Sequence, residues 1–133
     1  MKNLLRSLVM MLTLPTLTAQ GIEVKNDKSV ICGVPSVSTK PGTINYEQVE
    51  RSTQEYRTIK SEGVKKGSAR YNILISQMST RIKLSTELVA QDEGIDCVVR
   101  KGEIRRSEYE VKDLTKKVIE CLEDVNVTEV GSG

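Results

Sequence analysis

Apolar positions recur with helical spacing over two long stretches of the chain. The first covers about residues 47–62 and the second about residues 69–92. Gly63 ends the first pattern, and Ser68 is placed to cap the second. The pattern therefore predicts two antiparallel helices joined by a turn over residues 63–67.

The two predicted helices differ in the apolar surface that they carry. The first has a thin stripe made of Val49, Thr53, Tyr56 and Ile59. The second has a wider, heptad-like stripe, whose positions are Tyr71, Leu74, Ile75, Met78, Ile82, Leu84, Ser85, Leu88 and Val89. At 1.5 Å per residue the second helix would be roughly 36 Å long, so the pair is expected to form an arm rather than a compact cap.

After the helices the period of the pattern changes to two. Ile95, Cys97 and Val99 alternate with Asp96, which predicts a half-buried strand with the three apolar side chains on one face. Residues 101–102, Lys-Gly, supply a tight turn in which glycine can adopt a positive φ. The chain is therefore expected to reverse and form a hairpin.

A short closing helix is predicted after the hairpin. Asp113 or Thr115 can cap it, and its apolar stripe consists of Leu114, Val118, Ile119 and Leu122. A hairpin and one short helix bury too little surface to be stable alone. We therefore expect them to pack against other parts of the chain or against other subunits.

The first strand has two candidate positions. Residues 20–41 are punctuated by Gly, Pro, Ser and Asn and indicate a loop, with an edge strand at Ser29–Val34 as one option. The other option is a strand that ends at Ile44 and Asn45 and runs directly into the first helix at Tyr46. The later position is favoured because helical periodicity follows it at once. Together these elements predict an α+β fold with a small β-body, a protruding helical hairpin and a short C-terminal helix.

The first 19 residues have the pattern of a secretory signal peptide. Lys2 and Arg6 precede an apolar segment at about residues 8–17, which is too short for an ordinary membrane span. Cleavage is expected after Ala19 or after Thr18, and the mature protein is then expected in the periplasm. An uncleaved anchor or a buried helix is the alternative interpretation of this segment.

The charge balance argues against nonspecific binding to nucleic acid. The chain has 20 basic and 18 acidic residues, and loss of the predicted signal peptide removes Lys2 and Arg6, which leaves 18 of each. A domain without net charge lacks the attraction that drives such binding. The chain also has no Phe or Trp and only four Tyr, so its core must use Ile, Leu and Val, which favours cores shared between subunits.

The chain offers few residues for catalysis or metal binding. It has no His, no nucleophile motif, no glycine-rich phosphate loop and no zinc-ligand spacing. We therefore expect no catalytic site, no cofactor and no metal site. The cysteines, Cys32, Cys97 and Cys121, allow at most one intrachain disulfide, and Cys97 and Cys121 are interpreted as small core residues.

The C-terminal pattern contains an ordered set of residues that is more specific than any one of them. The set is Gly94, Ile95, Asp96, Cys97, Val98 and Val99, followed by Val111, Asp113, Leu114, Thr115, Val118, Ile119 and Leu122. It resembles the C-terminal signature of the Skp/OmpH-type periplasmic chaperones of outer-membrane proteins. The opening from Gly42, a short strand that leads into a helix, is similar to the same family. The resemblance covers roughly residues 42–124.

The resemblance implies a homotrimer that holds unfolded outer-membrane proteins between helical arms without using ATP. Unfolded outer-membrane proteins are then the expected partners, and peripheral contact with a membrane is also expected. The implied client-facing residues are Val64, Tyr71, Ile73, Leu74 and Met78, and packing within the hairpin or between subunits would explain each of them equally. The implied oligomer core consists of Ile44, Ile95, Cys97, Val99, Leu114, Val118 and Leu122.

The chain departs from the family in the length of its arm. The insertion between the two strands is about 50 residues, well short of the typical arm, so the enclosed cavity would be shallow. The alternative function is a small trimeric envelope protein that serves as a structural or adaptor module. We expect the family-like domain at residues 42–125, with the arm at about residues 47–92, after a loop or edge strand at residues 20–41 and before a flexible tail at residues 126–133.

Overall fold

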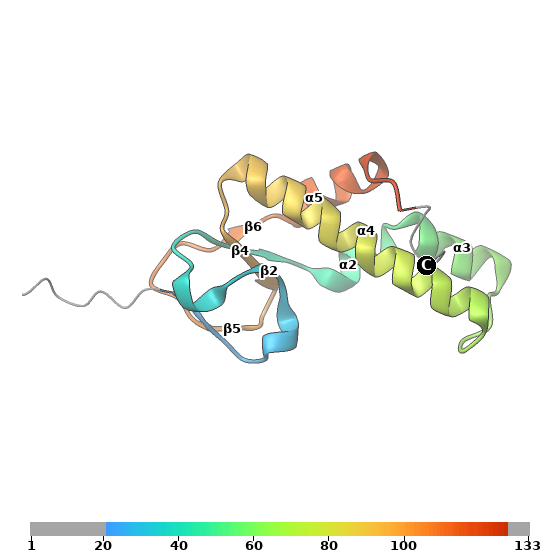
Figure 1. Cartoon of the computed structure of the whole chain (residues 1–133), viewed down its shortest axis with the longest axis horizontal. Coiled ribbons are helices and arrows are strands. Elements are labelled where there is room, and N and C mark those ends of the chain that lie inside the picture. The colour runs from blue at the N-terminus through green and yellow to red at the C-terminus, as the bar shows by residue number, and fades with distance from the viewer. Residues whose placement is uncertain (1–20, 128–133) are drawn as a thin grey trace, which may run out of the picture.

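A four-stranded sheet forms one end of the molecule in the computed structural model, which describes residues 21–127 (Figure 1). In spatial order its strands are β2 (Val30–Gly33), β4 (Cys97–Arg100), β3 (Pro41–Ile44) and β6 (Lys112–Asp113). β2 runs antiparallel to β4, whereas β3 is parallel to both of its neighbours. Parallel strands need a long crossover, and the helices between β3 and β4 supply it. The predicted α+β fold is confirmed.

The hairpin predicted around the turn at residues 101–102 does not form. A turn does follow β4, and Gly102 has the expected positive φ of 87°. However, β5 (Ile104–Arg106) pairs with β1 (Glu23–Val24) in a separate antiparallel ribbon. The physical reason is that β2 and β3 already occupy both edges of β4, so the return strand has to find another partner.

Both candidate positions for the first strand are strands. β3 ends at Ile44, and α2 (Tyr46–Arg51) begins two residues later, with the Asn45 side chain accepting a hydrogen bond from the backbone N–H of Gln48 at 3.2 Å. The favoured position is therefore confirmed. The other position, β2, is an edge strand on the far side of β4, and helical periodicity downstream carries no information about it.

The first predicted helix is divided into α2 and α3 (Gln54–Glu62). Thr53 causes the division, because its hydroxyl donates to the backbone oxygen of Glu50 at 2.7 Å and accepts from the N–H of Tyr56 at 3.1 Å. Side-chain bonds of this kind compete with the helical ladder and restart it as an N-cap. The break lies inside the predicted stripe, where Thr53 was counted as an apolar-face position.

The second predicted helix is confirmed as α4 (Ala69–Glu93). The Ser68 hydroxyl accepts from the N–H of Tyr71 at 3.2 Å, and Gly94 ends the helix with a φ of 69°. Gly63 likewise ends α3 in the left-handed conformation. These are the conformations in which serine caps a helix start and glycine caps a helix end.

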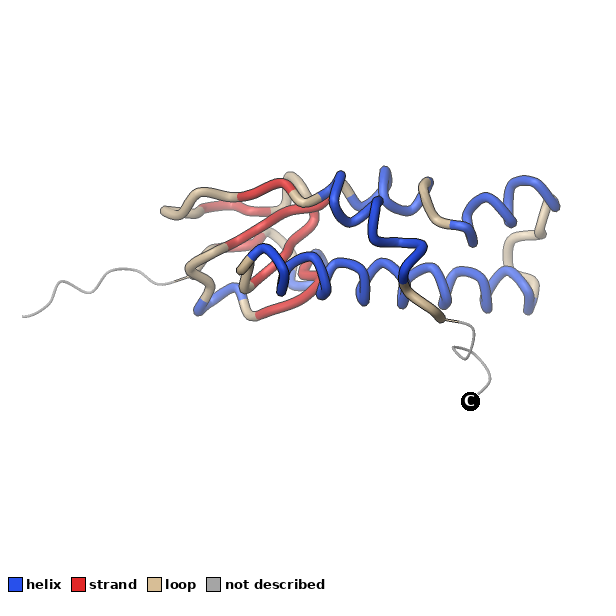
Figure 2. The backbone as a smooth tube through the Cα atoms, turned by 90° about the horizontal axis from the view of Figure 1, so that it is seen from above, coloured by secondary structure: helices blue, strands red, loops and turns tan. Residues whose placement is uncertain are grey.

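The arm projects less far than the length of α4 suggests. α3 packs against α4, and Figure 2 shows the two helical rows running side by side away from the sheet. However, none of residues 69–77 is fully buried, and from Met78 onward α4 belongs to the core. We call residues 69–77, which precede the first buried residue of α4, its free part. This part is about 14 Å long at 1.5 Å per residue. The expected arm of roughly 36 Å is therefore too long, because most of α4 packs on the body.

Strand β4 is buried on both faces, and not on one as predicted. Val98 faces the main core, with Ile44 and Ile82, whereas Cys97 and Val99 form a smaller cluster with Ile22. The small cluster is closed by side chains from the β1–β5 ribbon and its surroundings, namely Val24, Val30 and Ile104. The β1–β5 ribbon therefore gives β4 a second covered face.

Ile95 does not share a face with Cys97 and Val99. It is half-buried and packs against the main core, on the side of Val98. The reason is that β4 begins only at Cys97, so the alternation of faces does not extend back to Ile95. The prediction of three apolar side chains on one strand face is wrong at this residue.

The residues predicted to form an oligomer core are already covered within one chain. Those that are 0–2% exposed are Ile44, Cys97, Val99, Leu114, Val118 and Leu122. Helices α4 and α5 (Thr115–Cys121) cover one side of the sheet and the β1–β5 ribbon covers part of the other. The argument that these side chains need further subunits to cover them is therefore wrong.

The N-cap position of the closing helix is Leu114, which makes no side-chain cap bond, and not Asp113 or Thr115 as predicted. Asp113 lies one residue earlier and bonds to the first residue of the helix. Its carboxylate accepts from the backbone N–H of Thr115 at 2.9 Å and from the Thr115 hydroxyl at 2.6 Å. After α5 the chain continues through the 3-10 helix η3 (Leu122–Asp124). Val127 is buried, so the tail does not become free at residue 126 as predicted, because its valines join the core.

Two predicted segments lie outside the described residues. These are the signal peptide at residues 1–19 and the remainder of the tail at residues 128–133. Across residues 21–127, the structure contains no helix with the length and hydropathy required to span a membrane.

Candidate functional site

Three large apolar side chains lie exposed along one side of α4. Ile73, Leu84 and Leu88 are 45%, 38% and 51% exposed. Their separations of eleven and four residues correspond to about three turns and about one turn, so they share one side of the helix. We call these three residues the α4 face. Leu84 and Leu88 are one turn apart, whereas Ile73 lies about 16 Å further toward the tip of the arm, with the polar Gln77 and Thr80 between.

The structure separates the predicted client-facing residues into three groups. Ile73 is exposed and belongs to the α4 face. Val64, Tyr71 and Leu74 are half-buried near the tip of the arm. Met78 is buried in the main core, so its assignment to an exposed surface is wrong. Leu84 and Leu88 were counted as part of the internal stripe, which is too wide for one neighbour to cover.

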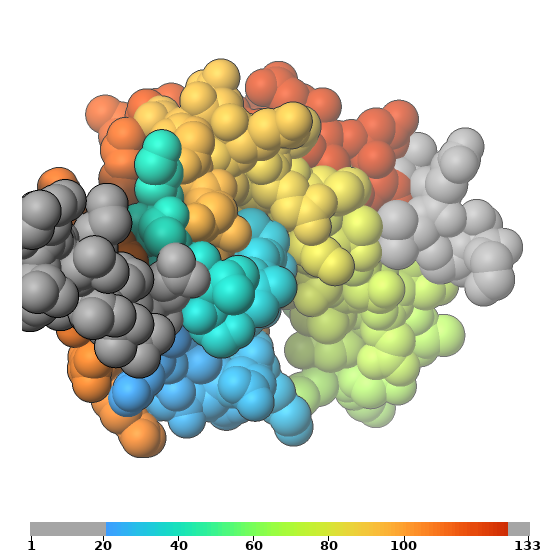
Figure 3. All heavy atoms as spheres, turned by 60° about the vertical axis from the view of Figure 1, so that its left-hand side comes forward, coloured from blue at the N-terminus to red at the C-terminus, as the bar shows by residue number. Residues whose placement is uncertain are grey.

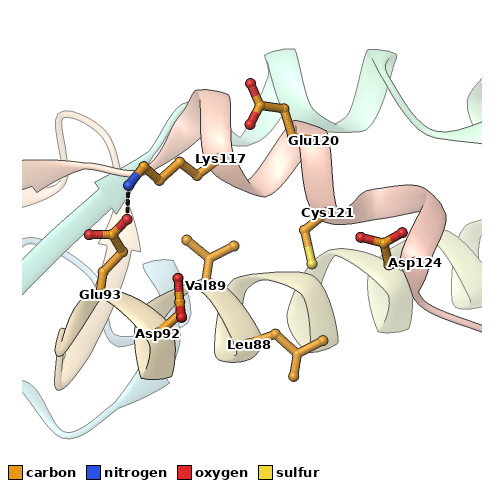
Figure 4. A pocket seen from close by; sticks show the side chains of 8 residues that line it. All are labelled: Leu88, Val89, Asp92, Glu93, Lys117, Glu120, Cys121 and Asp124. Atoms are coloured by element: carbon orange, nitrogen blue, oxygen red, sulfur yellow. Dashed lines mark ion pairs between the residues drawn. The ribbon is translucent and has the colours of Figure 1, made fainter.

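A groove of about 380 Å³ borders the α4 face (Figure 4). It lies between the end of α4 and α5, and Leu88 and Val89 supply its apolar wall. Its rim is mainly acidic, with Asp92, Glu93, Glu120 and Asp124 around one basic residue, Lys117. Glu93 is neutralised by ion pairs with Lys112 and Lys117. The groove can accept an apolar side chain next to a basic one.

A buried ion pair fixes the base of the arm. Arg81 on α4 and Glu55 on α3 are only 9% and 5% exposed. The guanidinium donates to both Glu55 carboxylate oxygens at 2.8–3.1 Å. Its remaining terminal nitrogen, Nη1, donates to the backbone oxygens of Leu122 and Val125 at 2.8 and 2.6 Å. One side chain thus joins α3, α4 and the C-terminal segment.

The position of Arg81 in the sequence indicates a buried charge, which the hydrophobic pattern alone does not predict. Arg81 lies three residues after Met78 and four before Ser85, which places it beside the buried stripe of the helix. A charged residue in such a position is rarely buried without a partner. The partner, Glu55, is 26 residues away, and no local rule identifies it.

Asp96 ties the loop before β3 to the start of β4. Its carboxylate accepts from the Ser38 hydroxyl at 2.5 Å, from the N–H groups of Thr39 and Lys40 at 2.9 and 3.2 Å, and from the Thr39 hydroxyl at 3.3 Å. Partial burial opposes ionisation, but these hydrogen bonds together hold the pKa of Asp96 below its ordinary value. The ionised form therefore stabilises the fold.

Asp96→Asn should reduce stability at neutral pH and much less in acid. A carboxyl group with a lowered folded-state pKa contributes stability above its unfolded pKa of about 3.9, and that contribution is lost as pH falls through the folded value. The difference in urea midpoint between wild type and variant is thus expected to be large near about pH 6 and to shrink below about pH 4. Asp92→Asn, at an exposed position, is the matched control. A difference for Asp96→Asn that does not change with pH would contradict this role.

The three cysteines are free. Cys32 packs against the main core and Cys97 lies in the small cluster on the other face of the sheet, so the two side chains are buried on opposite faces of neighbouring strands. Burial, with smaller contributions from Cys32 and Asp96, raises the pKa of Cys97 to about 11. Cys97 is therefore protonated at neutral pH and is a poor nucleophile. Within residues 21–127 the structure brings no three of the residue types His, Cys, Asp and Glu close enough to hold a metal ion.

Comparison of the chain with protein-family models, with curated proteins and with solved structures found no match.

Proposed function

We propose that the protein is an ATP-independent periplasmic chaperone that holds unfolded outer-membrane proteins. The proposal combines the resemblance of residues 42–124 to the Skp/OmpH-type chaperones, the secretory pattern of residues 1–19 and the surface of the arm. It assigns client binding to weak apolar contacts along the arm, which several copies of the chain would add together.

The α4 face is the observation that carries this proposal. Its three side chains expose apolar surface on a rigid helix that Arg81 and the C-terminal segment hold in place. Neighbouring exposed apolar residues such as Leu84 and Leu88 are characteristic of a binding surface, whereas a single one such as Ile73 needs no explanation by itself. Val64, Tyr71 and Leu74 are half-buried near the tip of the arm and lie outside the α4 face.

A specific observation favours the second candidate function, a structural or adaptor module of the envelope. The free part of α4 is only about 14 Å long, since the helix enters the core at Met78. Arms of this length would enclose little space for an unfolded chain. An adaptor would use the same α4 face to bind one folded partner.

The proposed homotrimer needs an interface other than the buried core. The edge strands β2 and β6 carry backbone groups that a neighbouring subunit can pair with. Val34 and Val37, next to β2, are exposed apolar side chains. We therefore place the subunit contacts at the edge of the sheet, away from the arm.

The combined change Ile73→Ser, Leu84→Ser and Leu88→Ser should weaken client holding severalfold without unfolding the protein. All three side chains are exposed, so their removal costs little stability but takes away the apolar contacts to a client. The measurement is light scattering by a denatured β-barrel protein diluted with and without each variant. Circular dichroism and sedimentation equilibrium establish that helicity and mass are unchanged.

The matched control is Asn72→Ser with Glu87→Ser, which changes exposed polar side chains of the same helix and leaves the apolar side chains and the proposed subunit contacts in place. This variant should protect the client as well as wild type does. If wild type gives no protection, the chaperone proposal fails and the adaptor function is preferred. If the α4-face variant protects fully, the client surface lies elsewhere.

A further inference from the structure

Three basic side chains from distant parts of the chain surround one hollow in the surface. Lys28 comes from the segment before β2, Lys83 from the middle of α4, and Arg100 from the end of β4. The hollow has a volume of about 250 Å³, and the other residues that line it are Val30, Ile31, Tyr46, Ser79 and Thr80. Figure 3 shows the notch where the N-terminal segment, in blue, faces the yellow-green part of α4. We call this site the basic hollow.

The basic residues of the basic hollow form no ion pair in the part of the chain that the structure describes. Basic residues elsewhere on the surface, such as Arg70, Lys101 and Lys112, form ion pairs. Among the described residues no ion pair involves Lys28, Lys83 or Arg100. Three cations around one hollow repel one another, and an anion placed between them would remove that repulsion.

Two acidic residues near the hollow leave an excess of positive charge. Glu50 interacts electrostatically with Arg100, and Glu87 lies one helical turn after Lys83. Neither residue lines the hollow. Its lining therefore presents three cations and no carboxylate to a ligand.

Arg100 lies over an aromatic ring. Its guanidinium carbon is 3.8 Å from the centre of the Tyr46 ring, a cation–π contact that limits the motion of the side chain and leaves its N–H groups able to donate hydrogen bonds. The Tyr46 hydroxyl lies 3.5 Å from the Ser79 hydroxyl. Hydroxyl groups of Tyr46, Ser79 and Thr80 thus add neutral donors to the charged ones.

We propose that the basic hollow binds a phosphate monoester group. Such a group carries about −1.5 to −2 charge at pH 7 and offers three acceptor oxygens, which matches three cations that approach from three elements. A single carboxylate carries half that charge and fewer acceptors. The group can belong to a free phosphorylated molecule or to a lipid headgroup, because three cations recognise the phosphate itself and not the molecule that carries it.

Two probes distinguish these sources in wild-type protein. Inorganic phosphate, titrated by calorimetry in low salt, tests the free group. Vesicles of phosphatidylcholine with and without phosphatidic acid, tested by co-sedimentation, present the same group on a lipid. We expect saturable binding with at least one probe, weakened as the ionic strength rises. Binding of phosphate alone identifies a soluble ester, and binding of phosphatidic acid vesicles alone identifies a headgroup.

The combined change Lys83→Gln and Arg100→Gln should lower the affinity for the bound probe at least tenfold. Lys83→Gln alone serves as the second variant, since it leaves the stacked Arg100 and the fold around it untouched, and a loss of severalfold is expected. The matched control is Arg105→Gln with Lys116→Gln, which removes the same charge from exposed positions outside the hollow. Equal losses in the control and the test variant, or no binding of either probe to wild type, would overturn the proposal.

Discussion

Arg81→Leu should destabilise the protein by about 3–5 kcal/mol, as expected when one partner of a buried ion pair is removed. The Glu55 carboxylate would remain buried without its counterion. The backbone oxygens of Leu122 and Val125 would also lose the donor that holds the C-terminal segment against α4. The measurement is urea unfolding followed by circular dichroism, with the midpoint compared at equal slope.

Two control variants distinguish the stability lost to an unpaired buried charge from the stability lost with a contact. Replacing both partners, Glu55→Leu with Arg81→Leu, leaves no unpaired charge and should recover much of the lost stability. Arg70→Leu breaks an exposed ion pair with Glu62 and should cost at most about 1 kcal/mol. An Arg81→Leu midpoint equal to that of wild type would contradict the buried position of the pair.

Val99→Asp should abolish cooperative folding or lower the melting temperature sharply. Val99 is fully buried in the small cluster with Ile22 and Cys97. That cluster is apolar, so a carboxylate placed there would be unpaired, which costs several kcal/mol against a total stability of about 5–15 kcal/mol. Thermal melting followed by circular dichroism measures the effect.

The matched control for Val99→Asp is Val111→Asp, because Val111 is 36% exposed and close in sequence. An aspartate there stays hydrated, and the melting temperature should change little. Since Val99 is covered within one chain, Val99→Asp tests the fold of the subunit and not only its assembly. A melting curve like that of wild type would show that the β1–β5 ribbon does not cover β4.

The local sequence determined the helices and their ends. α4 was predicted to within one residue, because its apolar period and the Ser68 cap both act within a few residues. The turn glycine Gly102 was predicted for the same reason. The cap of the closing helix was not, because Leu114 occupies the N-cap position and Asp113 only bonds to Thr115 beside it. The break at Thr53 also has a local cause, the hydrogen bond from its hydroxyl to Glu50. It was not predicted, because the apolar periodicity continues across it.

The candidate surface was predicted only in part. Ile73 was identified as a client-facing residue, whereas Leu84 and Leu88 were assigned to packing and Met78 to the surface. Periodicity shows that a helix has apolar positions, but it does not show how many neighbouring elements cover them. The division between the α4 face and the core depends on where α3, α5 and the sheet contact α4.

Only the tertiary structure decided the strand partners, the burial of β4 on both faces and the pairing of Arg81 with Glu55. β5 pairs with β1, about 80 residues earlier in the chain, and Arg81 meets Glu55 across 26 residues. Interactions over such separations depend on which surfaces the rest of the fold has already covered. The sequence shows which side chains are able to form these contacts. Which of them meet is determined by the packing of the whole chain.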